Sequence, residues 1–196
     1  MNWLIAFALL ATPLPEDPIT ATAVEYGAPS HLVAAFAELE QEFDVPEEFR
    51  GLLLAKAWRE SRYNPNAEGD WHVYDMTTKK LVKCKRGQPG CVPMAVGCIQ
   101  MWPWSEKRGL DRRDCVAAAR FYLAHIRRTM PKVTKLCRTK TDRAAWLVAQ
   151  IRINRGPKYR GGPWKGMTRC AGTPPKSIRI IKRWRTQRAV RVATRR

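Results

Sequence analysis

The sequence predicts a mostly helical domain with a tail at each end. Three observations favour this class: apolar residues recur at helical spacing, capping residues and prolines bound those segments, and alternating strand patterns are almost absent. A chain of 196 residues, 45% of them hydrophobic, suits one domain with a buried core. We expect a hydrophobic leader and linker at residues 1–29, the domain at 30–172 and a basic tail at 173–196.

The first segment of the chain is apolar and short. Residues 3–11 form a hydrophobic stretch, and residues 21–23 (Ala-Thr-Ala) resemble a small-residue cleavage site, but no basic residue precedes the stretch. A signal peptide and a simple hydrophobic N-terminus both fit this pattern. In either case we expect the chain up to Pro29 to lie outside the fold. No apolar run reaches the length of a membrane span, which argues against an integral membrane protein.

Helical periodicity begins at Ser30 and returns several times. Ser30 is a suitable N-cap, and Pro46 suits the first turn of a second helix that should run to Ser61. A third helix should begin after Asp111 or Asp114 and end at residue 131, and a fourth should cover residues 142–155. Between residues 64 and 93 the periodicity is lost, which indicates a long loop or a small hairpin.

The formal net charge of +19 hides a split between the two ends of the chain. Residues 1–75 carry 13 acidic and four basic side chains, whereas residues 76–196 carry 32 basic and four acidic ones. This imbalance implies an anionic partner, and nucleic acid, acidic wall polymer and anionic lipid all qualify. From Lys176 the tail has nine basic residues and no acidic one, with a ragged apolar stripe at Ile178, Ile181, Trp184, Val190 and Val192. It could be an interfacial helix at a membrane or a solvated basic tail.

Six cysteines form an even set, which suits disulfides in an exported chain. The best local pair is Cys84 with Cys91, which would close a Lys-Arg-Gly-Gln-Pro-Gly turn, and the other connectivity stays open. No cysteine pair has the spacing of a zinc knuckle, and the three histidines are scattered. We therefore expect neither a metal nor a cofactor.

A carboxylate lies on the apolar face of the second predicted helix. Phe49, Leu53 and Ala57 mark this face, and Glu60 follows them at helical spacing. A buried carboxyl in the last helical turn can hold a proton near neutral pH and donate it, as cleavage of a glycosidic bond requires. The alternative is a helix-end glutamate paired with Lys56 or Arg59.

Three segments resemble one enzyme family. Residues 60–67 read Glu-Ser-Arg-Tyr-Asn-Pro-Asn-Ala and resemble the Glu-Ser-x-aromatic-x-Pro-x-Ala signature of the soluble lytic transglycosylases. Residues 95–103 (Ala-Val-Gly-Cys-Ile-Gln-Met-Trp-Pro) look like the family's Gly-Leu-Met-Gln-Ile-x-Pro segment. Residues 149–157 (Ala-Gln-Ile-Arg-Ile-Asn-Arg-Gly-Pro) look like its Ala-Tyr-Asn-x-Gly-Pro segment. The three motifs occur in the family's order and span about residues 45–160.

The resemblance implies a lysozyme-like helical fold and the glycan strands of peptidoglycan as substrate. Glu60 would then be the single catalytic acid and base, closing a 1,6-anhydro ring at the cleaved sugar. The resemblance also implies an exported protein of the periplasm or cell envelope, which could be phage-associated. The candidate substrate-binding residues are Ser61, Tyr63, Gly97, Gln100 and Asn154.

The chain departs from the family pattern at Ile153, where the family has a tyrosine that orients the catalytic glutamate. Tyr63, Tyr122 or Tyr159 could supply a hydroxyl from elsewhere. The insertion after Glu60 also holds carboxylates that could position a water and make the enzyme a goose-type-like hydrolase: Glu68, Asp70 and Asp75.

Aromatic side chains flank the predicted site. Those in the insertion and after Gln100 could stack on sugar faces or be ordinary core residues: Trp71, His72, Tyr74, Trp102 and Trp104. Two hypotheses of a different kind remain for the function: a basic nucleic-acid-binding protein and an inactive wall-binding module. No named nucleic-acid fold motif occurs, so no specific nucleic acid is expected. Anionic wall polymer or a membrane surface could bind the basic tail.

Overall fold

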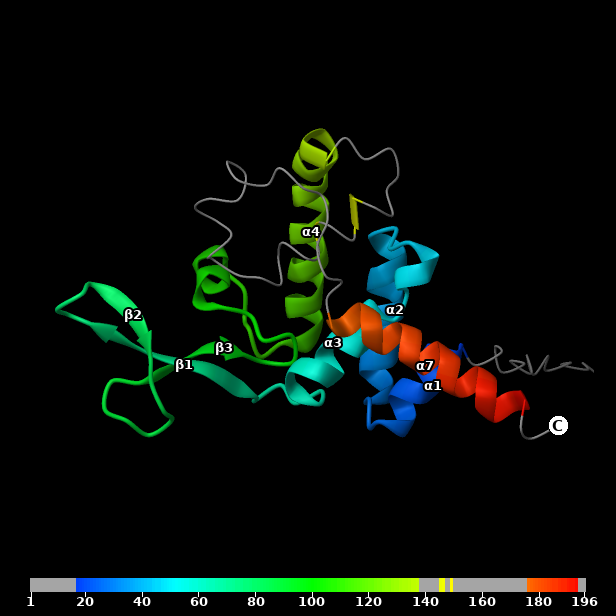
Figure 1. Ribbon diagram of the computed structural model, residues 1–196, viewed down its shortest axis with the longest axis horizontal. Coiled ribbons are helices and arrows are strands. Elements are labelled where there is room, and N and C mark those ends of the chain that lie inside the picture. The colour runs from blue at the N-terminus through cyan, green and yellow to red at the C-terminus, as the bar shows by residue number, and fades with distance from the viewer. Residues whose placement is uncertain (1–16, 138–144, 147–148, 150–175, 194–196) are drawn as a thin grey trace, which may run out of the picture.

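The computed structural model describes residues 17–137, 145–146, 149 and 176–193 (Figure 1). Along the chain it contains α1 (Pro18–Glu25), α2 (Ser30–Glu42), η1 (Glu47–Phe49), α3 (Leu52–Ser61), β1 (Glu68–Asp75), β2 (Lys80–Lys83), β3 (Val92–Val96), η2 (Pro103–Arg108), α4 (Cys115–Cys137) and α7 (Lys176–Ala193). The prediction of a mostly helical fold is confirmed in this coarse form. Within the described ranges, none of the helices has the length and apolarity that crossing a bilayer requires.

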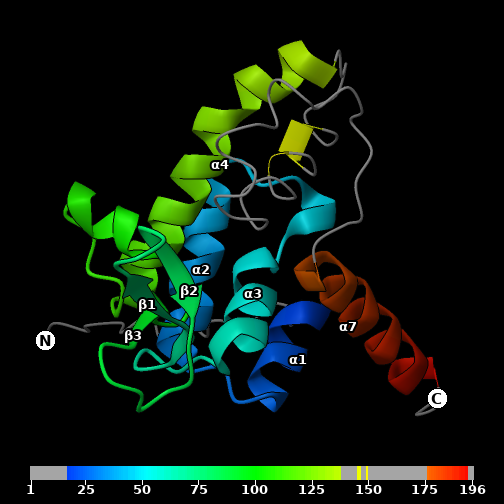
Figure 2. The ribbon, with the colours of Figure 1, turned by 60° about the vertical axis from the view of Figure 1, so that its left-hand side comes forward.

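Helix α3 lies at the centre of the helical body. It packs against α1, α2 and α7, and α2 also packs against α4 (Figure 2). Its residues Leu52, Leu53, Ala55 and Ala57 have no exposed surface. The apolar face predicted from the helical spacing therefore forms the centre of the core, and Glu60 stands at the end of that face.

Two segments that we expected outside the domain belong to its core. Helix α1 falls within the predicted leader and linker, yet Ile19 is completely buried against the start of α3. Helix α7 falls within the predicted basic tail, and its Ile178, Ile181 and Trp184 are buried while the helix packs on α1 and α3. The interpretation of a solvated tail is wrong for this helix, because the described residues of its apolar stripe are buried where α7 packs on α1 and α3.

The second predicted helix is interrupted. Instead of one helix from Pro46, the chain makes the short 3-10 helix η1 and then turns at Gly51, whose φ is +83°. A Cβ on Gly51 would lie 2.3 Å from Cγ2 of Ile19, so packing of α1 as well as the turn requires glycine here. At the start of α2, which is the first of the predicted helices, Pro29 rather than Ser30 occupies the N-cap position, and no side chain caps the helix.

Helix α4 also differs from its prediction. Asp114 caps it as expected, since its Oδ1 accepts hydrogen bonds from the backbone N–H groups of Val116 and Ala117, both at 2.9 Å. The helix continues through Pro131, where we expected it to end. A proline removes one helical hydrogen bond, but Val133 beyond it is fully buried, so packing holds the helix together.

The segment after α3 forms an antiparallel sheet with strand order β2-β1-β3. In its register His72 pairs with Lys83 on one side and with Val92 on the other. The hairpin alternative was therefore correct, although β3 adds a strand that the sequence did not reveal. The predicted Cys84–Cys91 disulfide is confirmed, and a second one joins Cys98 to Cys115.

Candidate functional site

Glu60 lies in the last turn of α3, where the helical body meets the sheet. Its side chain is 22% exposed, and its Oε1 lies 2.6 Å from Nη1 of Arg59 and 3.4 Å from Nζ of Lys56. The paired alternative is therefore the arrangement that the structure adopts. Both ion pairs fall on the same oxygen, Oε1, so the two cations hold the carboxylate from one side.

Lys56 is an unusual neighbour for a candidate catalytic group. It is buried in the apolar face of α3, one helical turn before Glu60, and its Nζ lies 4.8 Å from the centre of the Tyr122 ring on α4. Burial lowers the pKa of Lys56, while the nearby Glu60 carboxylate opposes that shift. Lys56 thus fixes one oxygen of Glu60 from inside the protein, and Arg59 fixes it from the surface.

Ser61 connects the first two motif segments. Its hydroxyl lies 3.0 Å from the carbonyl oxygens of both Ala57 and Cys98, to which it can donate. Cys98 is itself joined by a disulfide to Cys115, the first residue of α4. Three segments therefore meet at Ser61, the residue after Glu60: the end of α3, the segment after the sheet and the start of α4.

Gln100 and Gly97 connect the same segments a second time. The Gln100 side-chain amide donates to the carbonyl oxygens of Ala67 and Gly97 at 3.1 and 2.9 Å. The backbone N–H of Gly97 donates to the Ala67 oxygen at 2.9 Å. A Cβ at Gly97, whose φ is +83°, would lie 1.8 Å from the Arg112 carbonyl oxygen. The structure therefore gives both residues a role in holding the loops, and contact with substrate stays a prediction.

Tyr63 is buried beneath the loop that follows α3. Its hydroxyl has no hydrogen-bond partner among the described residues, and burial raises its pKa. A buried ring at this position supports the loop from inside rather than presenting an aromatic face to solvent. Tyr122 is also buried, on α4 below Lys56. Asn154, Ile153 and Tyr159 lie outside the described residues.

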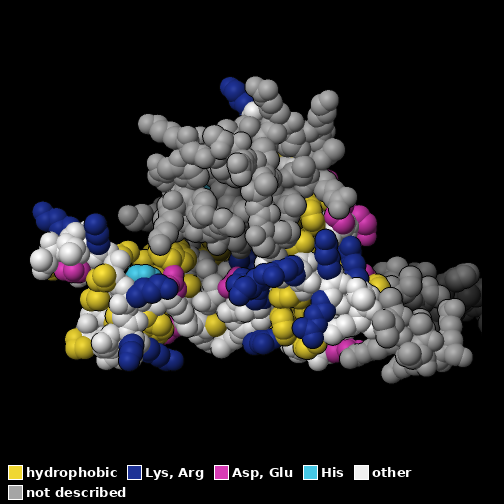
Figure 3. Space-filling view, viewed as in Figure 1, with side chains coloured by type: hydrophobic (Ala, Val, Ile, Leu, Met, Phe, Trp, Pro, Cys, Tyr) yellow, Lys and Arg dark blue, Asp and Glu magenta, His cyan; other side chains and the backbone are white. Residues whose placement is uncertain are grey.

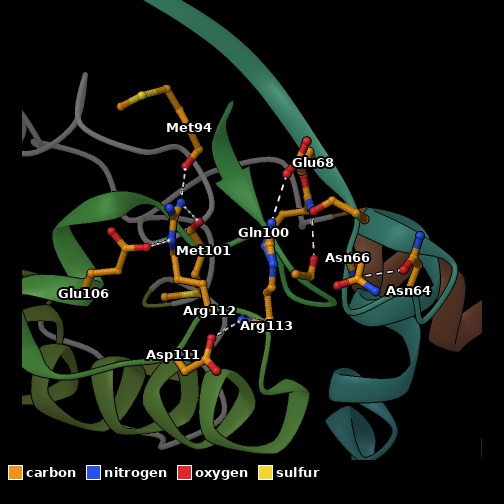
Figure 4. A network of polar contacts seen from close by, with 12 residues as sticks. Asn64, Asn66, Glu68, Met94, Gln100, Met101, Glu106, Asp111, Arg112 and Arg113 are labelled. Carbon is orange, nitrogen blue, oxygen red and sulfur yellow. Dashed lines mark hydrogen bonds and ion pairs between the residues drawn. The ribbon is translucent and has the colours of Figure 1, made fainter. Parts of the chain in front are cut away.

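Two arginines that the sequence did not single out join the segments around Glu68 and Gln100 to the start of α4 (Figure 4). Nη1 of Arg112 donates to the carbonyl oxygens of Met94 and Met101, both at 3.1 Å, and its Nε pairs with Glu106. Arg113 reaches back to Glu68 at 3.0 Å. Nothing in the local sequence distinguishes these arginines from the many others, because most of their acceptors lie in other segments: the carbonyl oxygens of Met94 and Met101 and the carboxylate of Glu68.

The three carboxylates considered for a hydrolytic water have different surroundings. Glu68 is paired with Arg113, and the carboxylate of Asp75 accepts hydrogen bonds from Thr77 and Thr78 in the β1–β2 turn. These turn bonds lower the pKa of Asp75. Asp70 lies on β1 with a φ of +53°, and its Oδ1 is 3.8 Å from Nζ of Lys83. Asp70 is the candidate that neither a short ion pair nor a turn engages.

The aromatic residues of the insertion are divided between core and surface. His72 is buried, and its ring lies 5.9 Å from that of Trp102. Trp71 is partly buried, with the Arg86 guanidinium 5.6 Å from its ring, whereas Tyr74 is exposed. The side chain of Trp104 lies outside the description.

We compared the chain with protein-family models, with curated proteins and with solved structures, and none of the three comparisons found a match. Among the residues that the structure describes, no cluster of His, Cys, Asp and Glu could hold a metal ion. The described site therefore consists of one partly exposed carboxylate, two adjacent cations and a junction of segments joined by hydrogen bonds and a disulfide.

Proposed function

We propose that this protein is a peptidoglycan lytic transglycosylase, with Glu60 as its single catalytic acid and base. One observation carries the proposal. The Glu60-bearing helix end and the segment at residues 95–103 resemble two motifs of that family, and Ser61 and Gln100 join them through hydrogen bonds. Two distant segments that resemble parts of one active site thus lie side by side. A lysozyme-like arrangement of the fold is part of the same proposal.

The proposed reaction uses Glu60 twice. In its protonated form Glu60 donates its proton to the oxygen that links the N-acetylmuramic acid to the next sugar, and the bond from that oxygen to C1 breaks. The carboxylate then accepts the proton of the muramic acid's own 6-hydroxyl, whose oxygen bonds to C1. Glu60 ends as it began, and no water is consumed. Because one carboxyl performs both transfers, no partner at a fixed distance is required.

The two cations beside Glu60 hold its carboxylate in one orientation, because both pair with Oε1. A fixed carboxyl can meet the glycosidic oxygen and then the 6-hydroxyl from the same position. Arg59 is partly exposed and can move away as a sugar approaches, whereas Lys56 is held in the core.

The charge of the surface suits a wall polymer. Lys and Arg side chains gather over α3 and α7 in Figure 3, and Arg62 follows Glu60 with its guanidinium 3.8 Å from the Trp58 ring. Muramic acid and peptide stems carry carboxylates that such a surface attracts. The two disulfides fit an exported protein that acts in the periplasm or cell envelope.

The test measures soluble fragments released from purified peptidoglycan by the native protein and by Glu60→Gln. We expect Glu60→Gln to release none while it stays folded and still sediments with the wall. The matched control is Glu47→Gln, because Glu47 is an exposed glutamate paired with Arg50 and should be dispensable. Equal fragment release by Glu60→Gln would refute the proposal.

A hydrolase is the second candidate function, and the backbone conformation of Asp70, with a φ of +53°, favours it. A positive φ at a residue other than glycine stores strain, and such strain often occurs at functional sites. Asp70 could hold a water as general base opposite Glu60. In that case Asp70→Asn would abolish fragment release, whereas the transglycosylase mechanism does not need Asp70.

A further inference from the structure

The three-stranded sheet projects from the helical body (Figure 1), and its outer part carries exposed apolar side chains. We call residues 73–92 the arm: the end of β1, the β1–β2 turn, β2 and the disulfide loop. Met76, at the turn, is 79% exposed, and four more large apolar side chains of the arm are exposed: Tyr74, Leu81, Val82 and Val92. Grouped exposed apolar residues on one projecting element indicate an interaction site.

The apolar side chains of the arm lie on both faces of the sheet. Tyr74 pairs with Leu81, and the neighbouring pair is Val73 with Val82. Because successive residues of a strand point to opposite faces, these two pairs lie on opposite sides. A partner that docks flat on one face would leave the other face in water. A partner that surrounds the end of the arm would cover both.

The same element is strongly basic. The arm contains five basic residues: Lys79, Lys80, Lys83, Lys85 and Arg86. Its one acidic residue, Asp75, uses its carboxylate to hold the β1–β2 turn. The single carboxylate offsets one of the five positive charges, so the arm keeps a net charge of +4, and Figure 3 shows basic side chains at its end.

We propose that the arm binds the surface of an anionic lipid bilayer, with its apolar end among the headgroups and upper acyl chains. A bilayer surrounds the inserted end, which accounts for apolar residues on both faces, and its anionic headgroups account for the lysines. Lysine stems can lie along apolar surface while their ammonium groups stay at the phosphates. An acidic polysaccharide would match the charge but gives no reason for an exposed Met76.

The sequence suggested that helix α7 binds a membrane, but its apolar residues are not available for this contact. The described apolar residues of its stripe, Ile178, Ile181 and Trp184, are buried against the protein. Those side chains could meet a membrane only if α7 left α1 and α3. The arm needs no such change, because its disulfide and its turn hold it in place before binding. Little conformational freedom is then lost on binding.

The experiment is co-sedimentation of the full chain with large vesicles of phosphatidylcholine alone, or mixed in equal parts with phosphatidylglycerol. We expect binding to the mixed vesicles only. Met76→Ser with Leu81→Ser should weaken it by about tenfold or more, because apolar area no longer enters the bilayer. Lys79→Ser with Lys80→Ser should weaken it by about tenfold as well.

The matched control for the charge is Lys182→Ser with Arg183→Ser, two exposed residues of α7 at the opposite end of the molecule in Figure 1. This pair loses the same charge and should change binding by less than about threefold. Binding to soluble heparin should be the same for Met76→Ser with Leu81→Ser as for the native chain. Three results would each overturn the proposal. They are no vesicle binding by the native chain, unchanged vesicle binding by Met76→Ser with Leu81→Ser, and an equal loss of binding in Lys79→Ser with Lys80→Ser and in Lys182→Ser with Arg183→Ser.

Discussion

Nζ of Lys56 lies 3.4 Å from Oε1 of Glu60, one turn further along α3, and links the buried core to the candidate catalytic group. A buried ion pair contributes little net stability, because both charges lose their water, and it acts mainly on geometry. We therefore infer that Lys56 is a positioning residue, which acts by holding Oε1 of Glu60.

Lys56→Met tests this relationship, because methionine keeps the length of the side chain without the charge. We expect the free energy of unfolding at neutral pH to change by less than about 1 kcal/mol, because Glu60 is partly exposed and keeps Arg59 as a partner. Fragment release should fall several-fold, and its pH profile should change shape, since Glu60 loses one of its two cations. Lys56→Arg should restore part of the activity, whereas a purely structural role would leave the pH profile unchanged.

The same variant should change how stability depends on alkaline pH. The pKa of Lys56 is lowered in the folded protein, so above that lowered value the unfolded chain binds more protons than the native one. Native stability therefore gains from Lys56 as the pH rises towards 10.5, the ordinary value for lysine. Denaturant unfolding at several alkaline pH values should show this gain in the native protein and its absence in Lys56→Met.

Glu40 of α2 holds the start of α3. Its carboxylate oxygens accept hydrogen bonds from the backbone N–H groups of Gly51 and Leu53, at 2.6 and 2.7 Å. Burial raises the pKa of Glu40 to about 7 although these hydrogen bonds lower it. The native protein thus retains a proton that the unfolded chain releases near pH 4.5.

Stability should therefore fall as the pH rises from about 4.5 to 7, by up to about 1.4 kcal/mol for each pH unit. Glu40→Gln should lack this slope, which urea unfolding across the range will measure. Glu38→Gln, at an exposed glutamate of the same helix, is the matched control and should keep it. The same slope in Glu40→Gln would show that another group causes it.

Gly97 is the glycine that the site can least replace. Gly97→Ala would drive a Cβ into the Arg112 carbonyl oxygen and add backbone strain at positive φ. We expect a loss of roughly 3–5 kcal/mol in the free energy of unfolding, together with loss of activity. Gly87→Ala has a similar φ of +89° with no atom within 4 Å, so it should cost only about 1–2 kcal/mol. Equal losses in the two variants would mean that the close approach is unimportant.

The two disulfides should differ in their effect. Cys98→Ala with Cys115→Ala opens a loop of 17 residues behind Glu60 and should cost about 3 kcal/mol of stability and much of the activity. Cys84→Ala with Cys91→Ala opens a loop of seven residues in the arm and should leave wall cleavage intact. Thermal unfolding and fragment release, measured side by side, separate the two roles.

The sequence predicted the mostly helical class and the position of Glu60 at the end of the buried face of α3, because apolar spacing along one helix depends only on local geometry. It did not predict the bounds of the helices, since Gly51 interrupts one and α4 continues through Pro131. It could not show which partner covers an apolar stripe, so α7 was interpreted as a tail although Trp184 is buried. Glu40 lies four residues after Phe36, on the buried face of α2, and that spacing could have revealed it. Arg112 had no such signal, because its acceptors are backbone oxygens of another segment.

Mass spectrometry of the fragments released from purified peptidoglycan, with Glu60→Gln as the control, tests the central claim most directly. We expect fragments that end in a 1,6-anhydro sugar and are lighter by one water than hydrolysed ones, and none from Glu60→Gln. Fragments of full hydrolysed mass with reducing ends would contradict the transglycosylase mechanism and favour a hydrolase with Asp70 as base. Release of no fragment by the native protein would contradict the enzyme assignment itself.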